Sequence, residues 1–189
     1  MIHKITESIA SKFTISEVWA KVYPFVEPVT SADGKTVPAE YISKGNYKAI
    51  EYDKFKGIIY TRLNGDVRLQ ESELTSNPCK GATEMTFPMR SVSVIKKEFS
   101  PDECFADDYY GNKIVSLINK LSLSSVDGIR RTTVNVESIK HGNQTLVNEE
   151  YDGYDKKDFP LQYSYVAVDY SVVVIANLDC LTQLCESYG

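Results

Sequence analysis

The chain contains, at residues 161–176, the run LQYSYVAVDYSVVVIA. Alternate side chains of this run form an apolar face, as in a strand with one side buried. The residues on that face are Val166, Val168, Tyr170, Val172, Val174 and Ala176. A strand of this length spans ~50 Å, which exceeds the length of the usual strand. We expect it to bend, or to project from the fold with a Val-rich edge that a neighbour covers.

Shorter strand-like runs precede this segment. They are expected at residues 18–23, 47–52, 57–63, 66–70, 85–95, 129–140 and 144–150. Asn64-Gly65 separates two of these runs. It predicts a tight hairpin turn, because a type I′ turn needs positive φ at both central residues.

Two helices are expected. Ile2, Ile5, Ile9 and Phe13 recur at helical spacing and predict a helix over residues 2–14. The run 100–103, Ser-Pro-Asp-Glu, has the form of a capping box with Pro in the first turn, so a second helix is expected behind it. We expect that helix to break near its glycine at position 111.

The order of these elements shows no regular βαβ alternation, which favours an α+β protein. We predict a mainly antiparallel sheet with long hairpins, packed by two helices. The length of 189 residues suits a single domain over 1–189. Turn-forming residues predict a long loop at about 27–46 and a second loop at about 151–160.

The charge balance argues against a nucleic-acid-binding surface, since 21 basic and 26 acidic residues give a formal net charge of −5. No apolar run is long enough to predict a membrane span. The segment 33–36, Asp-Gly-Lys-Thr, matches the end of a phosphate-binding loop, but Pro38 stands where that motif continues into a helix. The four cysteines are expected as free thiols, because their spacing fits neither a redox pair nor a zinc site.

Two acidic clusters are candidates for catalytic or calcium-binding groups. They comprise Asp102, Glu103, Asp107 and Asp108, and Glu149, Glu150, Asp152, Asp155 and Asp158. The first set suits a helix N-terminus, and the second does not match the calcium-loop spacing. His3 and His141 are the only histidines, and neither accompanies a nucleophile motif. We therefore predict no catalytic residues, no cofactor and no metal, and a protein that is not an enzyme.

The chain is rich in tyrosine, with 13 in all. Tyrosines on loops are typical of protein interfaces, although tyrosine also packs within sheets. The predicted interface residues are Tyr41, Tyr47, Tyr151, Tyr154, Tyr163 and Tyr165.

Three stretches carry a resemblance to a known family. They are Val18–Pro24, reading Val-Trp-Ala-Lys-Val-Tyr-Pro, the segment 100–103 with the helix behind it, and the long strand at 162–176. In this order they resemble the tail-terminator and head–tail connector proteins of tailed bacteriophages. The Lys-, Tyr-, Asn- and Ile-rich composition is also similar to virion proteins of crAss-like phages.

The resemblance implies a structural virion protein that is assembled in the host cytoplasm and forms a ring of six or twelve copies in the phage neck or at the tail end. Its partners would be further copies and other neck, portal or tail proteins. DNA would pass through the channel of the ring without specific binding. The acidic charge balance suits this role, because a negatively charged channel wall would let DNA slide without sticking. Two alternatives remain open: a small hydrolase using the acidic clusters, and a Tyr-rich module that binds protein or carbohydrate.

Overall fold

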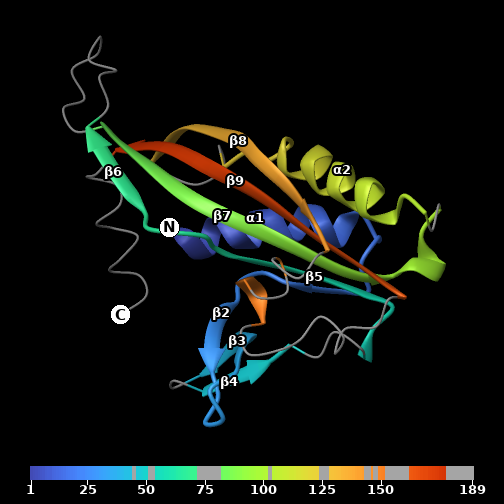
Figure 1. Ribbon diagram of the computed structural model, residues 1–189. Helices are drawn as coiled ribbons and strands as arrows, with labels where there is room; N and C mark the ends of the chain where they lie inside the picture. Colours follow the sequence, from blue (N-terminus) through green and yellow to red (C-terminus); the bar gives the residue numbers. More distant parts are fainter. Residues whose placement is uncertain are drawn as a thin grey trace.

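The computed structural model describes residues 1–43, 46–50, 54–71, 82–101, 104–123, 128–142, 146, 149–151 and 162–177. Within them the chain forms a six-stranded main sheet, a separate three-stranded sheet and two α-helices (Figure 1). The elements are α1 (Ile2–Ile15), β1 (Lys21–Tyr23), β2 (Glu27–Thr30), β3 (Thr36–Ser43), β4 (Asn46–Ala49), β5 (Gly57–Leu63), β6 (Arg68–Glu71), β7 (Ala82–Lys96), a 3-10 turn (Lys97–Phe99), α2 (Ala106–Ile118), β8 (Ile129–His141) and β9 (Tyr163–Asn177). The α+β class with mainly antiparallel pairing is confirmed.

Two strands of equal length form the centre of the main sheet, whose order is β1-β5-β7-β9-β8 with β6 also paired to β7. β7 and β9 have 15 residues each and pair antiparallel from end to end. β8 pairs with the other side of β9. The expectation of a projecting terminal strand with an exposed edge is therefore wrong. A period of two identifies which face of a strand is buried, but not which strands lie along its two edges.

Asn64-Gly65 does not fold the chain back into a hairpin. β5 and β6 are both antiparallel to β7, so they lie one after the other along the same side of that strand. Residues 64–67 bulge between them beside Pro88, whose carbonyl accepts a 2.9 Å hydrogen bond from the N–H of Asn64. Gly65 has a φ of 142°. The positive φ that a glycine readily adopts is therefore used here in an irregular bulge and not in a hairpin turn.

Both helices cover one face of the main sheet (Figure 1). α1 packs its apolar stripe over β1 and β5, and α2 packs its stripe over β8 and β9. The six alternate residues predicted for the buried face of β9 are all fully buried. The side chains that form this core include Ile5, Ile9, Phe13, Tyr110, Ile114, Ile118, Val168, Tyr170, Val172 and Val174. The helix predicted over residues 2–14 is confirmed as α1.

The second helix differs from its prediction at two points. α2 begins at Ala106 behind Phe105, which gives no side-chain cap, and the acidic half of the expected capping box (102–103) lies outside the described residues. The helix also continues through Gly111 without a break. A Cβ at this glycine would lie 2.8 Å from Cγ2 of Ile139 on β8. Glycine is thus used for close approach of helix and sheet.

The segment predicted as a loop at 27–46 is a small antiparallel sheet with the order β2-β3-β4, which we call the arm (residues 27–49). Figure 1 shows it set apart from the main sheet. Of the turn-forming residues that suggest a loop, Asp33 and Gly34 lie in the tight connection between β2 and β3, where Gly34 has a φ of 82°. Pro28 and Pro38 instead lie opposite each other within β2 and β3. Of the other predicted loop, 151–160, only its first residue lies within the described part of the chain.

The face of the main sheet away from the helices has its own smaller core, which includes Ile58, Tyr60, Val92, Leu146 and Ala167. The sequence predicts residues 144–150 as a strand that forms a hairpin with β8. Its described residues 146, 149 and 150 are helical instead, and the strand that pairs with β8 is β9. Sequence alternation could not distinguish these two partners of β8.

Candidate functional site

The arm carries two of the tyrosines predicted for an interface. Tyr41 of β3 and Tyr47 of β4 are cross-strand partners whose ring centroids lie 5.5 Å apart, edge to face. They are 53% and 40% exposed, and the adjacent Ile42 is 55% exposed. The Tyr47 hydroxyl donates to Glu27 Oε2 at 2.7 Å, and this hydrogen bond raises the pKa of Tyr47. The arm thus presents apolar side chains to solvent in a fixed arrangement.

The opposite edge of the main sheet is formed by β8. The arm is inserted between β1 and β5, which lie at the other end of the strand order. No strand within the described ranges pairs with the outer side of β8. Its exposed side chains include Arg130, Arg131 and Val136. Its register against β9 shifts at two points, an irregularity that commonly protects an open edge from indiscriminate pairing. The protein therefore has two unlike surfaces at opposite edges of one sheet.

The other tyrosines predicted for an interface lie in the body of the protein. Tyr163 begins β9 and is 5% exposed, while Tyr165 is half-buried and its ring centroid lies 6.1 Å from that of Tyr163. Tyr151 is also 5% exposed. Tyr154 lies outside the described residues. Tyr151 and Tyr163 therefore fill interior space, as tyrosines in sheets often do.

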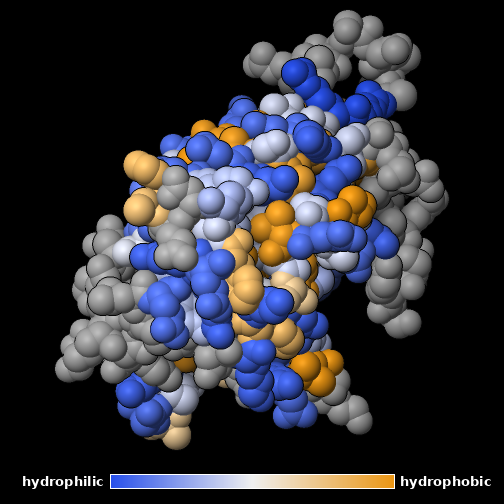
Figure 2. All heavy atoms as spheres, turned by 90° about the vertical axis from the view of Figure 1, so that its right-hand side faces the viewer, coloured by the Kyte–Doolittle hydropathy of each residue, from blue (hydrophilic) through white to orange (hydrophobic). Residues whose placement is uncertain are grey.

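Apolar side chains reach the surface of the body as well. Figure 2 shows them in separate clusters among hydrophilic side chains on one face of the molecule. The exposed ones on the body include Ile15, Leu69, Phe99 and Phe105. Single exposed apolar residues are normal for a protein surface. The arm differs because its tyrosines form a defined pair in strand register.

A row of charged residues that the sequence did not suggest crosses the main sheet on the face away from the helices. Arg62 of β5, Arg90 of β7, Asp169 of β9 and Ser138 of β8 lie opposite one another in successive strands. Arg90 is 2% exposed and Asp169 is 6% exposed. The Arg90 guanidinium binds the Asp169 carboxylate through two hydrogen bonds, Nε to Oδ1 at 2.6 Å and Nη2 to Oδ2 at 3.0 Å. Such two-point pairing is the strongest form of an ion pair.

Two glutamates that follow β8 complete this ionic row. Glu150 Oε1 lies 2.6 Å from Arg62 Nη2 and 2.9 Å from Arg90 Nη1. Glu149 Oε2 lies 2.6 Å from Arg90 Nη1 and 2.9 Å from Lys140 Nζ. Burial raises the pKa of Glu149, but hydrogen bonds from Lys140 and Arg90 outweigh it and hold that pKa below its ordinary value. Every buried charge of the row is thus paired, as burial requires.

A signal for this row was present in the sequence. Arg90 directly follows Met89, and Asp169 stands between Val168 and Tyr170, so each charge interrupts a run of strand residues. Charged residues are seldom fully buried unless they are paired. Two opposite charges in two strands predicted to be buried could therefore have been assigned to each other.

The two described members of the first acidic cluster, Asp107 and Asp108, also have partners. Asp107 Oδ1 accepts a hydrogen bond from Ser164 Oγ at 2.5 Å, and Asp108 Oδ1 lies 3.6 Å from His141 Nε2. Among the described residues no three His, Cys, Asp or Glu side chains could hold a metal ion. The other members of the two acidic clusters, 102–103, 152, 155 and 158, lie outside the described part of the chain.

The structure as described is an α+β protein with a long antiparallel sheet, two helices on one face and an arm at one edge. No protein-family model matches the chain, and no curated protein matches its sequence. In the part of the chain that the structure describes, no helix is long and apolar enough to cross a membrane. Kinship with phage neck proteins is therefore a proposal.

Proposed function

We propose that the chain is a non-enzymatic structural protein of a tailed bacteriophage, which forms a ring in the neck or at the tail end and joins head or portal to tail around the DNA channel. The observation that carries the proposal is the position of two unlike surfaces on one sheet. The arm, with Tyr41 and Tyr47 exposed, lies at the edge formed by β1 and β5. The long β8 lies at the other edge.

Two different surfaces on opposite sides of a subunit favour head-to-tail association. A contact of this kind closes into a ring when the rotation between subunits divides a full turn. The arm of one copy would contact β8 of the next, with Tyr41 and Tyr47 as apolar anchors, since aromatic residues carry much of the energy of interfaces. Pairing with the arm would also satisfy backbone groups on the outer side of β8. Six or twelve copies would enclose the channel.

The acidic charge balance agrees with this role. With a net charge of −5 per copy, a ring would present DNA with a wall that repels its phosphates and lets it slide. Neck, portal or tail proteins would contact the two faces of the ring, and assembly would take place in the host cytoplasm.

The arm tyrosines speak against the carbohydrate-binding alternative. Their planes are inclined at 68° to each other, edge to face. A sugar ring stacks best on an open, flat aromatic face, whereas this arrangement is typical of an aromatic pair that packs as a unit. The hydrolase alternative would use carboxylates of the acidic clusters. The described carboxylates of the second cluster, Glu149 and Glu150, form ion pairs with arginines, which speaks against this alternative.

The proposal is tested by native mass spectrometry of the purified protein over a range of concentrations. Rings of six or twelve copies are expected. The double variant Tyr41→Ser/Tyr47→Ser and the single variant Val136→Lys should each shift the population toward monomers, because they alter opposite sides of the same contact. Tyr109→Ser, which changes an exposed tyrosine on α2, is the matched control and should leave the rings intact.

A cross-link then identifies the contact directly. A photo-reactive phenylalanine analogue placed at Tyr41 should attach to peptides of residues 129–141 of a second copy. Attachment elsewhere would refute the contact between the arm and β8. A protein that stays monomeric at every concentration and is found in no phage neck by electron microscopy would refute the function itself.

A further inference from the structure

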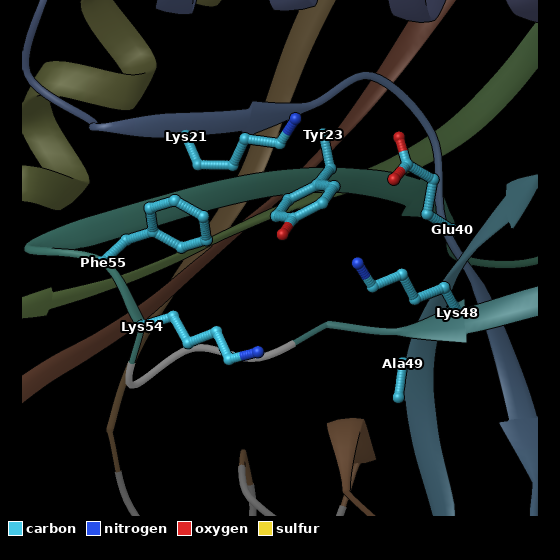
Figure 3. Close-up of a pocket in the computed structure, with 7 residues that line it drawn as sticks. All are labelled: Lys21, Tyr23, Glu40, Lys48, Ala49, Lys54 and Phe55. Carbon is cyan, nitrogen blue, oxygen red and sulfur yellow. The ribbon is translucent and has the colours of Figure 1, made fainter.

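The face of the main sheet away from the helices is covered in part by a short segment that follows β8. Of this segment the structure describes Leu146 and residues 149–151, and we call these four residues the strap. Leu146 is buried in the apolar core of that face. The same core reaches the hollow between the arm and the main sheet, which Tyr23 and Phe55 help to line (Figure 3). The strap and the base of the arm thus border one apolar core.

The ionic row attaches the strap to the sheet a second time, through charge. The strands contribute three cations to the row but only one anion; they are Arg62, Arg90 and Lys140, and Asp169. Glu149 and Glu150 of the strap supply two further negative charges, and both form ion pairs with cations of the strands. Among the described residues, the row is therefore neutral only while the strap lies on the sheet.

Glu150 is buried and has donors from two central strands. Its carboxylate accepts hydrogen bonds from Nε and Nη2 of Arg62 on β5, and from Nη1 of Arg90 on β7. The hydroxyl of Tyr60, also on β5, donates to Glu150 Oε2 at 3.0 Å. Burial and the charge of Glu150 raise the pKa of Tyr60 well above its ordinary value, and Tyr151 of the strap adds to this effect. The phenol therefore stays protonated and remains a donor to the carboxylate.

We propose that Glu149 and Glu150 form an acid-operated latch, whose protonation releases the strap from the sheet and uncovers the apolar core beneath it. Once both carboxylates are protonated, the three cations of the row face only the charge of Asp169. Buried cations without counter-charges are unfavourable, and water and counter-ions reach them when the strap has left. The central strands stay paired, because Asp169 keeps its two-point pair with Arg90 and a hydrogen bond from Asn64.

The latch is closed at neutral pH and opens toward acid. Burial raises the pKa of Glu149, but hydrogen bonds from Lys140 and Arg90 outweigh it and hold that pKa below its ordinary value. In the released strap, Glu149 takes up a proton near the ordinary glutamate pKa of about 4.3. Its ion pairs therefore favour the closed strap fully above about pH 5.5. This preference is lost as the pH falls through the ordinary glutamate range and below it.

Hydrogen exchange of the full chain, followed by mass spectrometry, tests the proposal. The quantity measured is the protection of the amides of residues 149–151, relative to an unstructured peptide at the same pH. Between pH 7 and pH 3.5 we expect this protection to fall at least tenfold, while the amides of α1 and β9 retain theirs. At pH 7, Glu149→Gln/Glu150→Gln should cause the same local loss, because glutamine keeps the shape of the side chain without its charge.

The matched control is Glu7→Gln/Glu98→Gln, which removes two exposed glutamates on α1 and the 3-10 turn and should leave the protection of the strap at pH 7 unchanged. Unchanged protection of the strap in Glu149→Gln/Glu150→Gln would overturn the proposal. So would a loss in α1 and β9 at the same pH as in the strap, because the opening would then be global unfolding. If the double variant does not fold, the acid series of the unaltered chain decides the same question.

Discussion

Arg90 and Asp169 lie directly opposite each other on β7 and β9, and their side chains form a two-point ion pair in the interior of the protein. The two residues are 79 positions apart in sequence. Their pairing favours this register of the two longest strands, because a slip of one strand by one residue would place the two charges on opposite faces of the sheet. The register of β7 and β9 thus depends on a buried ion pair as well as on apolar packing.

Replacing Asp169 should destabilise the fold strongly. Asp169→Ala removes the two-point partner of a buried guanidinium, and breaking a buried pair on one side typically costs about 3–5 kcal/mol of unfolding free energy. Urea denaturation measures this loss. Arg131→Ala is the control, since Arg131 is exposed on β8 and its removal should change stability by no more than about 0.5 kcal/mol. Equal effects of the two variants would contradict the assignment.

Stability should fall as the solution is acidified. Burial raises the pKa of Asp169, but the hydrogen bond and charge of Arg90 outweigh it and hold that pKa below its ordinary value. The unfolded chain therefore takes up this proton at a higher pH than the folded protein does. The contribution to stability is complete above about pH 5 and is lost as the pH falls through the ordinary aspartate range and below it. Unfolding free energies at pH 7, 5, 4 and 3 check this, and Asp169→Asn should show a shallower decline than the unaltered protein.

The single tryptophan depends on a serine of β7. Trp19 is 4% exposed, and its indole Nε1 donates to Ser93 Oγ at 2.7 Å. Ser93→Ala leaves that buried donor without its acceptor, which should cost about 1–3 kcal/mol. Urea unfolding followed by the fluorescence of Trp19 measures the change. Ser93→Thr keeps the hydroxyl and should retain more of the stability; if it is as damaging as Ser93→Ala, the hydrogen bond is not the cause.

Adding one methyl group to α2 should weaken the fold, although alanine is the better helix former by about 1 kcal/mol. In Gly111→Ala the new Cβ would lie 2.8 Å from Ile139 Cγ2 and 3.4 Å from Val166 Cγ1. Overpacking of this kind costs about 1–3 kcal/mol, so we expect a net destabilisation of roughly 1 kcal/mol. Thermal unfolding measures it. Ser116→Ala, at an exposed position of α2, should instead be neutral or slightly stabilising.

The cause of the Gly111 effect can be isolated with a second change. In Ile139→Ala the branched side chain that meets the new methyl group is gone, so Gly111→Ala should do less harm in that background. Fully additive effects of the two substitutions would show that the close contact of α2 with β8 is not responsible.

Local sequence patterns determined the elements and their buried faces. The period of two in the last long run identified β9 and the six residues it buries, and the spacing of isoleucines identified α1. These predictions succeeded because burial of one face imposes its period on any helix or strand, whatever lies opposite. The exposed tyrosine pair of the arm could be named as interface candidates, but its strand register could not.

Partners along the strands were decided only by the tertiary structure. The sequence could not show that β9 is covered on both edges, that Asn64-Gly65 forms a bulge beside Pro88, or that Glu149 and Glu150 join the ion pair of Arg90 and Asp169. Each depends on segments that are distant in the chain, and the same alternating pattern is compatible with several neighbours. The choice among them rests on strand lengths that match, buried charges that must be neutralised and backbone groups that must be hydrogen-bonded, all of which exist only once the sheet is assembled.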